Sequence, residues 1–106
     1  MSVELTNFVK ILKSKERKIA YTKHAPKRAE TRSMSLGIFE SDIKNETPVA
    51  VVEQKCESLG ERKFDVYYRQ ASGLYHRYVI VLNETIRLIT LMRISKDLQK
   101  NLVRKR

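Results

Sequence analysis

The sequence predicts a single α+β domain in which a four-stranded antiparallel meander follows N-terminal helices and precedes a short C-terminal helix. The apolar residues follow a helical period in the first part of the chain, and from Val49 they change to alternating or continuous β-branched runs. The links between these runs, "ESLGER", "ASG" and "NE", have the length of hairpin loops. A chain of 106 residues forms one core, so we expect one domain over 1–106.

Residues 1–18 form the first predicted segment, an amphipathic helix with a Lys-rich far side. Such an apolar stripe must pack against something, either the rest of the domain or a second copy in a homodimer. The next short stretch, "KIAYTK", is compatible with a brief strand outside the four-stranded sheet. The stripe consists of Val3, Leu5, Phe8, Val9, Ile11 and Leu12.

Two further helices are expected before the sheet. Pro26 is tolerated in the first turn of a helix, so the second helix should begin near it and continue to Arg32. Ser35 is a suitable cap for a third helix, which should end before the turn at Thr47 and Pro48. The main body of the domain should therefore extend over residues 19–100.

Four strands are expected in series, and their runs are "VAVVEQKC", "KFDVYYRQ", "LYHRYVIVL" and "TIRLITLMRI". Strict alternation in the last run places Leu88 and Thr90 on one face and Arg87, Leu91 and Arg93 on the other. After these strands, "SKDLQKNLVRKR" predicts a short helix and a basic tail at 101–106.

The charge indicates the class of partner. The chain carries 22 Lys and Arg against 12 Asp and Glu, a net charge of +10, and such a surface attracts polyanions. Nucleic acid is the first candidate, and an anionic membrane face, an acidic protein or a merely solubilising surface are the alternatives.

The same composition excludes several classes of protein. No apolar run has the length of a signal peptide or a membrane span, so we expect a cytoplasmic protein without membrane insertion. Cys56 is the only cysteine and cannot form an intramolecular disulfide. No phosphate-binding loop, dinucleotide glycine pattern or metal-ligand spacing appears, so we expect no cofactor and no metal site.

The segment "YTKHAPKRAETR" contains the strongest candidate site. His24, Arg28 and Arg32 are four residues apart, which places the two arginines on one stripe of a helix. Guanidinium groups and free N–H groups of a first helical turn suit phosphate oxygens. An exposed basic helix whose Arg32 pairs with an acid explains the same spacing equally well. His24 and His76 are the candidates for proton transfer, although an isolated histidine is more often structural.

A second candidate surface lies on the middle strands, where tyrosines alternate with arginines. Aromatic rings that stack on bases, beside cations that hold the backbone, are typical of single-strand binding. Tyrosines also favour strands for packing reasons alone, which remains the alternative. The side chains concerned are Tyr67, Tyr68, Arg69, Tyr75, Arg77 and Tyr78.

RNA is a substrate that such a site can cut without a metal ion. RNA carries its own nucleophile, the 2′-hydroxyl group. An enzyme therefore needs a base, an acid and positive charge for the crowded phosphorane, and basic and histidine side chains supply these.

The motif "HAPKRAETR" resembles the His-Ala-x-x-Arg-x-x-x-Arg signature of a small domain family that is itself similar to the RelE and BrnT ribonuclease toxins. The C-terminal "IRLITLMRISKDLQ" is similar to the ending of the BrnT type. The resemblance covers residues 19–100 and implies a RelE-like fold. It also implies a metal-independent endoribonuclease, free or ribosome-associated, that an acidic antitoxin protein neutralises.

Carried over by position, the resemblance supports His24, Arg28 and Arg32 as catalytic residues, and more weakly Arg93. It supports nucleic-acid contacts by Arg87 and Lys96 with the same weaker basis as Arg93. The helix at the start of the chain and Pro26 are departures from the family pattern. Two alternatives to a toxin remain, a noncatalytic nucleic-acid-binding protein of a virus or plasmid and a module that receives an acidic peptide.

Overall fold

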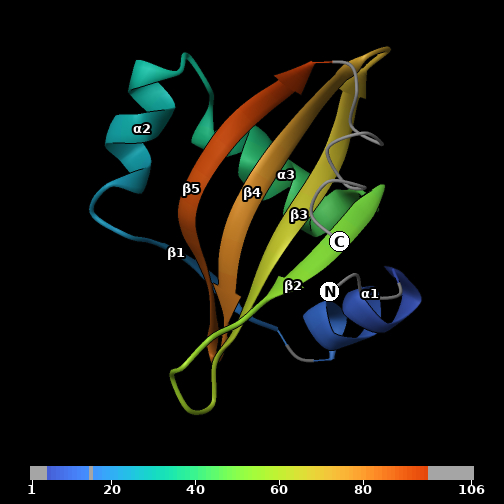
Figure 1. Ribbon diagram of the computed structural model, residues 1–106, viewed down its shortest axis with the longest axis vertical. Helices are drawn as coiled ribbons and strands as arrows, with labels where there is room; N and C mark the ends of the chain where they lie inside the picture. Colours follow the sequence, from blue (N-terminus) through green and yellow to red (C-terminus); the bar gives the residue numbers. More distant parts are fainter. Residues whose placement is uncertain (1–4, 15, 96–106) are drawn as a thin grey trace.

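A computed structural model describes residues 5–14 and 16–95 of the chain (Figure 1). Over these residues, the α+β class and the expected order of three helices, a short strand and the later strands are confirmed. The expected C-terminal helix, the basic tail and Lys96 lie outside the described residues. The elements are α1 (Leu5–Lys13), β1 (Lys18–Tyr21), α2 (Ala25–Thr31), α3 (Leu36–Asn45), β2 (Ala50–Gln54), β3 (Arg62–Ala71), β4 (Leu74–Leu82) and β5 (Thr85–Ser95).

The sheet is mixed and has five strands in the order β1-β5-β4-β3-β2, so the expectation of four antiparallel strands is wrong. The meander from β2 to β5 is antiparallel, as expected. The additional strand is β1, which pairs parallel to β5 from Lys18 opposite Thr85 to Tyr21 opposite Leu88. A run of four residues has too short an alternation to reveal such a distant partner, and the apolar pattern therefore did not place β1 in the sheet.

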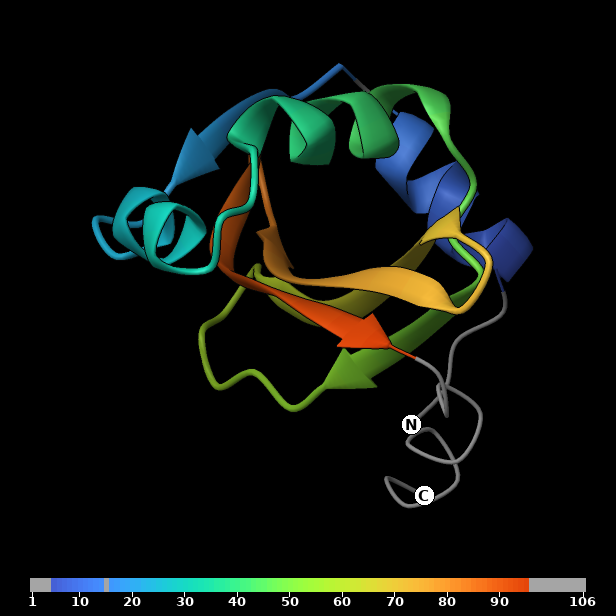
Figure 2. The same ribbon diagram turned by 90° about the horizontal axis from the view of Figure 1, so that it is seen from above.

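The helices gather on one side of the sheet, with α3 across its face and α2 beside β5 (Figures 1 and 2). Aromatic contacts connect the helices to the sheet. The ring centroid of Phe39 in α3 lies 4.8 Å from that of Tyr78 in β4. The ring of Phe8 in α1 lies 5.2 Å from that of Phe64 in β3. Helix α1 thus places its apolar face in the core of its own chain, and a homodimer through this helix stays a prediction.

The ends of α2 and α3 follow local sequence rules. Ser35 Oγ accepts hydrogen bonds from the N–H groups of Gly37 and Ile38, as expected for a cap of α3. Helix α2 ends in a Schellman arrangement: Ser33 N donates to Glu30 O and Met34 N to Ala29 O. Ser33 has a φ of 53°, a left-handed conformation that usually selects glycine. The turn leads the chain directly into the cap of α3.

An irregularity in β5 changes which face its side chains occupy. Val79 pairs with Thr90, but the next residue, Ile80, pairs with Leu88, so β5 contains one additional residue. The expected strict alternation along this strand is therefore wrong beyond Leu88. As a result, Arg93 lies opposite His76 on the face that the helices cover, while Arg87 projects from the other face opposite Val81.

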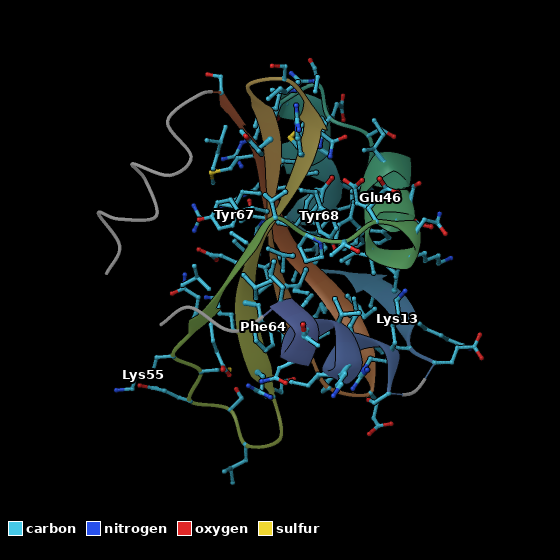
Figure 3. All side chains as sticks on the ribbon, turned by 90° about the vertical axis from the view of Figure 1, so that its right-hand side faces the viewer. Lys13, Glu46, Lys55, Phe64, Tyr67 and Tyr68 are labelled. Carbon is cyan, nitrogen blue, oxygen red and sulfur yellow. The ribbon has the colours of Figure 1, made fainter. Side chains whose placement is uncertain are left out.

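The face of the sheet away from α3 also buries side chains. Figure 3 shows Tyr67 and Tyr68 on opposite sides of the sheet, with Tyr68 on the side of α3 and Glu46. Both tyrosines are buried, as are Asp65 and Val79. Tyr67 and Tyr68 are therefore not part of an exposed aromatic surface on either face of the sheet. Within residues 5–14 and 16–95, no helix is long and apolar enough to cross a membrane.

Candidate functional site

The arginines of the sequence motif face strand β5. Arg28 Nη1 donates to Thr90 Oγ1 at 3.0 Å, and Arg32 Nη1 approaches the same oxygen at 3.3 Å. Arg32 Nη1 also donates to the carbonyl oxygen of Leu91. The chain approaches β5 just before α2, where Thr22 N donates to Leu88 O at 3.1 Å. These contacts fasten α2 to the strand.

Arg93 joins the same edge from β5. Its Nη2 donates to the carbonyl oxygen of Ser33, in the turn between α2 and α3. We call Arg28, Arg32 and Arg93 the arginine cluster. Arg28 and Arg93 are exposed, while Arg32 is half-buried. A guanidinium has five N–H donors, so each exposed member has donors beyond the bonds described and is able to contact a phosphate.

His24 and Arg32 lie at opposite ends of α2. His24 is exposed and directly precedes α2, and its side chain makes no capping hydrogen bond. Arg32 follows it by eight residues, which corresponds to about 12 Å along a helix axis. The expected spacing is present, but it places His24 and Arg32 at opposite ends of α2. Arg28 lies between them.

The strand residues expected to contact nucleic acid differ in their exposure to solvent. Arg69 is exposed and Tyr75 is half-buried, so both reach solvent. Arg87 Nη2 lies 3.5 Å from Glu61 Oε1 and is partly exposed. Arg77 Nη2 lies 2.6 Å from the buried Asp65 Oδ2, which makes a structural role the stronger interpretation.

Tyr78 does not fit the expected role in base stacking. Its side chain has no exposed surface and packs between Phe39 and Tyr68. Tyr68 is also buried. A ring enclosed in this way cannot stack on a base without opening the core, because its π-face is already covered by other side chains.

Tyr78 instead belongs to a chain of polar groups in the core. Its hydroxyl donates to Asp42 Oδ2 at 2.6 Å, and its oxygen lies 3.1 Å from His76 Nδ1. Gln70 Nε2 donates to the same carboxylate oxygen at 2.8 Å. We call Asp42, Tyr78 and His76 the buried polar chain. It connects α3 to β4 and reaches the strand position that faces Arg93.

Burial and neighbouring charges shift the pKa values in this chain. Desolvation lowers the pKa of His76 below its usual 6.5, Asp42 opposes this shift and Arg93 adds to it. Burial, together with the hydrogen bond to Asp42, raises the pKa of Tyr78. His76 is therefore neutral at pH 7, and Tyr78 keeps its proton.

The sequence contained only a weak signal for the buried polar chain. His76 and Tyr78 are two residues apart on a predicted strand, so they share a face. Nothing in the local pattern around Asp42 indicated that its carboxylate would meet them, because that contact joins α3 to β4. His76 was a candidate for proton transfer, but its partners were not predictable.

A groove of about 920 Å³ lies between α1, β1 and α3, on the helix side of the sheet. Leu12, Ile19 and Ile43 contribute apolar lining, and Lys13 and Lys44 contribute cations.

In the part of the chain that the structure describes, no group of three His, Cys, Asp or Glu side chains is placed to hold a metal ion.

Comparisons of the chain with protein-family models, with curated proteins and with solved structures find no match.

Proposed function

We propose that this protein is a metal-independent endoribonuclease with a RelE-like fold, the toxin of a toxin–antitoxin pair. The observation that supports it best is the arginine cluster, in which Arg28 of α2 and Arg32 at its C-terminal end bond to Thr90 of β5, and Arg93 of β5 bonds to Ser33 just after α2. The net charge of +10 attracts RNA to this surface.

The arginine cluster would act on the scissile phosphate. Arg28 and Arg93 are exposed and offer donors to the phosphate oxygens, while Arg32 fixes α2 against β5. Positive charge held in place before the reaction stabilises the phosphorane as its charge develops. His24, at the start of α2, would contact the RNA on the same side. Arg69 and Tyr75, which are partners on the face of the sheet opposite to Arg93, would bind nucleotides farther along the RNA strand.

The resemblance to RelE and BrnT toxins adds an acidic antitoxin protein as partner. A strongly basic surface supports such a partner, because an acidic chain competes with RNA for the same cations. An acidic protein encoded beside this one, purified and added at one equivalent, should then stop RNA cleavage. If the acidic protein binds this chain but RNA cleavage continues at the same rate, the assignment of an antitoxin is contradicted.

End-labelled total RNA incubated with the protein and excess EDTA tests the activity. The wild type should leave 2′,3′-cyclic phosphate ends, and Arg28→Ala and Arg93→Ala should each cut about 100-fold more slowly. Arg62→Ala is the matched control, because Arg62 is a partly exposed arginine that pairs with Glu53 on β2. It should cut at the rate of the wild type.

A noncatalytic nucleic-acid-binding protein is the second candidate. The hydrogen bonds of Arg32 and Arg93 to protein carbonyl oxygens favour it, because they show arginines used to hold the fold together. In that case the wild type binds RNA and leaves it intact, also when ribosomes are added. That result would remove the enzyme and retain the basic surface.

A further inference from the structure

We propose that His76 is the catalytic residue that exchanges protons with RNA, and that Tyr78 and Asp42 are its positioning residues. This inference rests on the proposed ribonuclease function. It differs from the assignment of His24, which the spacing of the sequence motif suggested. Its basis is the geometry of the buried polar chain next to Arg93.

The hydrogen bonds of the chain determine where its protons lie. The hydroxyl of Tyr78 donates to Asp42 Oδ2, so its only proton is used. The oxygen of Tyr78 must then accept the bond from His76, whose Nδ1 carries the proton. In the neutral ring, Nε2 is the atom with the free lone pair. Among the described residues, His76 makes no other hydrogen bond, so the lone pair of Nε2 is not engaged by another group there.

The position of His76 in the sheet brings this base to the arginine cluster. His76 and Arg93 are direct partners across β4 and β5, on the same face of the sheet. Side chains paired in this way have Cβ atoms about 5 Å apart. Arg93 is exposed, and His76 keeps 5% of its surface accessible. A phosphate held by Arg93 would therefore lie beside the imidazole.

The groups that face His76 come from every neighbouring element. Asp42 approaches from α3, Tyr78 is on β4, Tyr68 is its partner on β3, and Arg93 is its partner on β5. Burial and Arg93 lower the pKa of His76, and Asp42 raises it. The lowered pKa keeps the ring neutral at pH 7, the form that accepts a proton.

Cleavage would require the transfer of one proton to His76 and the exchange of one bond at phosphorus. Nε2 of His76 takes the proton of the 2′-hydroxyl, and the 2′-oxygen forms a bond to phosphorus. The bond between phosphorus and the 5′-oxygen breaks, its electron pair remains on that oxygen, and water supplies the proton that completes the 5′-hydroxyl. The products are a 2′,3′-cyclic phosphate and a 5′-hydroxyl end. The imidazolium then releases its proton to solvent.

Rate measurements on substituted proteins test the assignment. His76→Gln keeps a side chain of similar polarity without a base of suitable pKa, and it should lower kcat by about 100-fold or more. Its affinity for RNA should remain close to that of the wild type, because the arginine cluster is unchanged. Thermal unfolding of each variant verifies that it is folded at the assay temperature.

Two tyrosine variants form a matched pair. Tyr78→Phe removes a hydroxyl that donates to Asp42, and Tyr21→Phe removes one that donates to Glu40, which is not part of the buried polar chain. Tyr78→Phe should lower kcat about tenfold with little change in KM. Tyr21→Phe should leave both constants unchanged. Equal effects of the two substitutions would indicate a structural role and overturn the positioning role.

The pH profile separates positioning from mere stability. Cleavage requires neutral His76, so the rate should fall as the pH drops through the pKa of His76, which lies below 6.5. The carboxylate of Asp42 raises that pKa, so Asp42→Asn should move the fall in rate to lower pH. A loss of stability alone would reduce the amount of folded enzyme and leave the midpoint in place. An unmoved midpoint would overturn the proposal.

The outcomes also distinguish this inference from the proposed function. If the wild type cuts RNA and His76→Gln cuts equally well, His76 is not the base and the ribonuclease assignment stands. The same conclusion follows if His24→Gln loses activity and His76→Gln does not. If the wild type cuts no RNA, with or without ribosomes, both the function and the inference are wrong.

Discussion

Arg77 and Asp65 form an ion pair whose carboxylate has no exposed surface. Arg77 Nη2 lies 2.6 Å from Asp65 Oδ2, and Gln54 Nε2 donates to the same oxygen at 2.8 Å. Arg77→Leu would leave the buried carboxylate without this cation. We expect the free energy of unfolding, measured in urea, to fall by about 3 kcal/mol.

The pair of Arg62 and Glu53 is the control for this prediction. Both of its bonds are 2.8 Å long, but the side chain of Arg62 is 45% exposed and that of Glu53 is 31% exposed. Water solvates these charges once the pair is broken, so Arg62→Leu should cost less than about 1 kcal/mol. Equal losses in the two variants would show that burial does not determine the effect.

The end of α2 depends on a residue in an unfavourable backbone conformation. Ser33 occupies the left-handed position of the Schellman turn, and its carbonyl accepts the bond from Arg93. Glycine adopts this conformation without the steric penalty and keeps the carbonyl. Ser33→Gly should therefore raise the free energy of unfolding by about 1 kcal/mol, as thermal denaturation would show. A loss of stability would mean that the serine side chain has a role of its own.

The elements also show which parts of the fold the sequence determines locally. The cap at Ser35 and the limits of β4 were predictable, because each depends on residues within a few positions. The additional residue in β5 was not, because it is defined only by the register against β4. The parallel pairing of β1 was missed for the same reason. Both errors concern contacts between elements.

For the whole molecule, the net charge of +10 predicts a strong dependence of RNA binding on salt. If the three arginines of the cluster neutralise three phosphates, the slope of log affinity against log salt should be about −2 for a single strand. Filter binding at salt concentrations from about 50 to about 300 mM measures this slope. A slope near zero would show that the charge does not serve RNA binding.

The candidate site was predictable only in part. The spacing of Arg28 and Arg32 indicated a shared stripe, and the structure places both on Thr90. The spacing could not show that this stripe faces a strand. Asp42, Tyr78 and His76 are separated by up to 36 positions in the chain and meet only when α3 packs on the sheet. Such a site follows from tertiary packing, which periodicity does not reveal.

The parallel pairing of β1 with β5 also determines the order in which the chain can assemble. Thr22 and Ile89, which extend this contact, are 67 positions apart, whereas the meander from β2 to β5 needs only neighbouring hairpins. Nearby contacts form faster, so the meander should precede the docking of β1. Until then the backbone edge of β5 is unpaired, and β1 of a second chain can occupy it. We therefore expect refolding at high concentration to yield a domain-swapped dimer and refolding at low concentration to yield the monomer, which size-exclusion chromatography would distinguish.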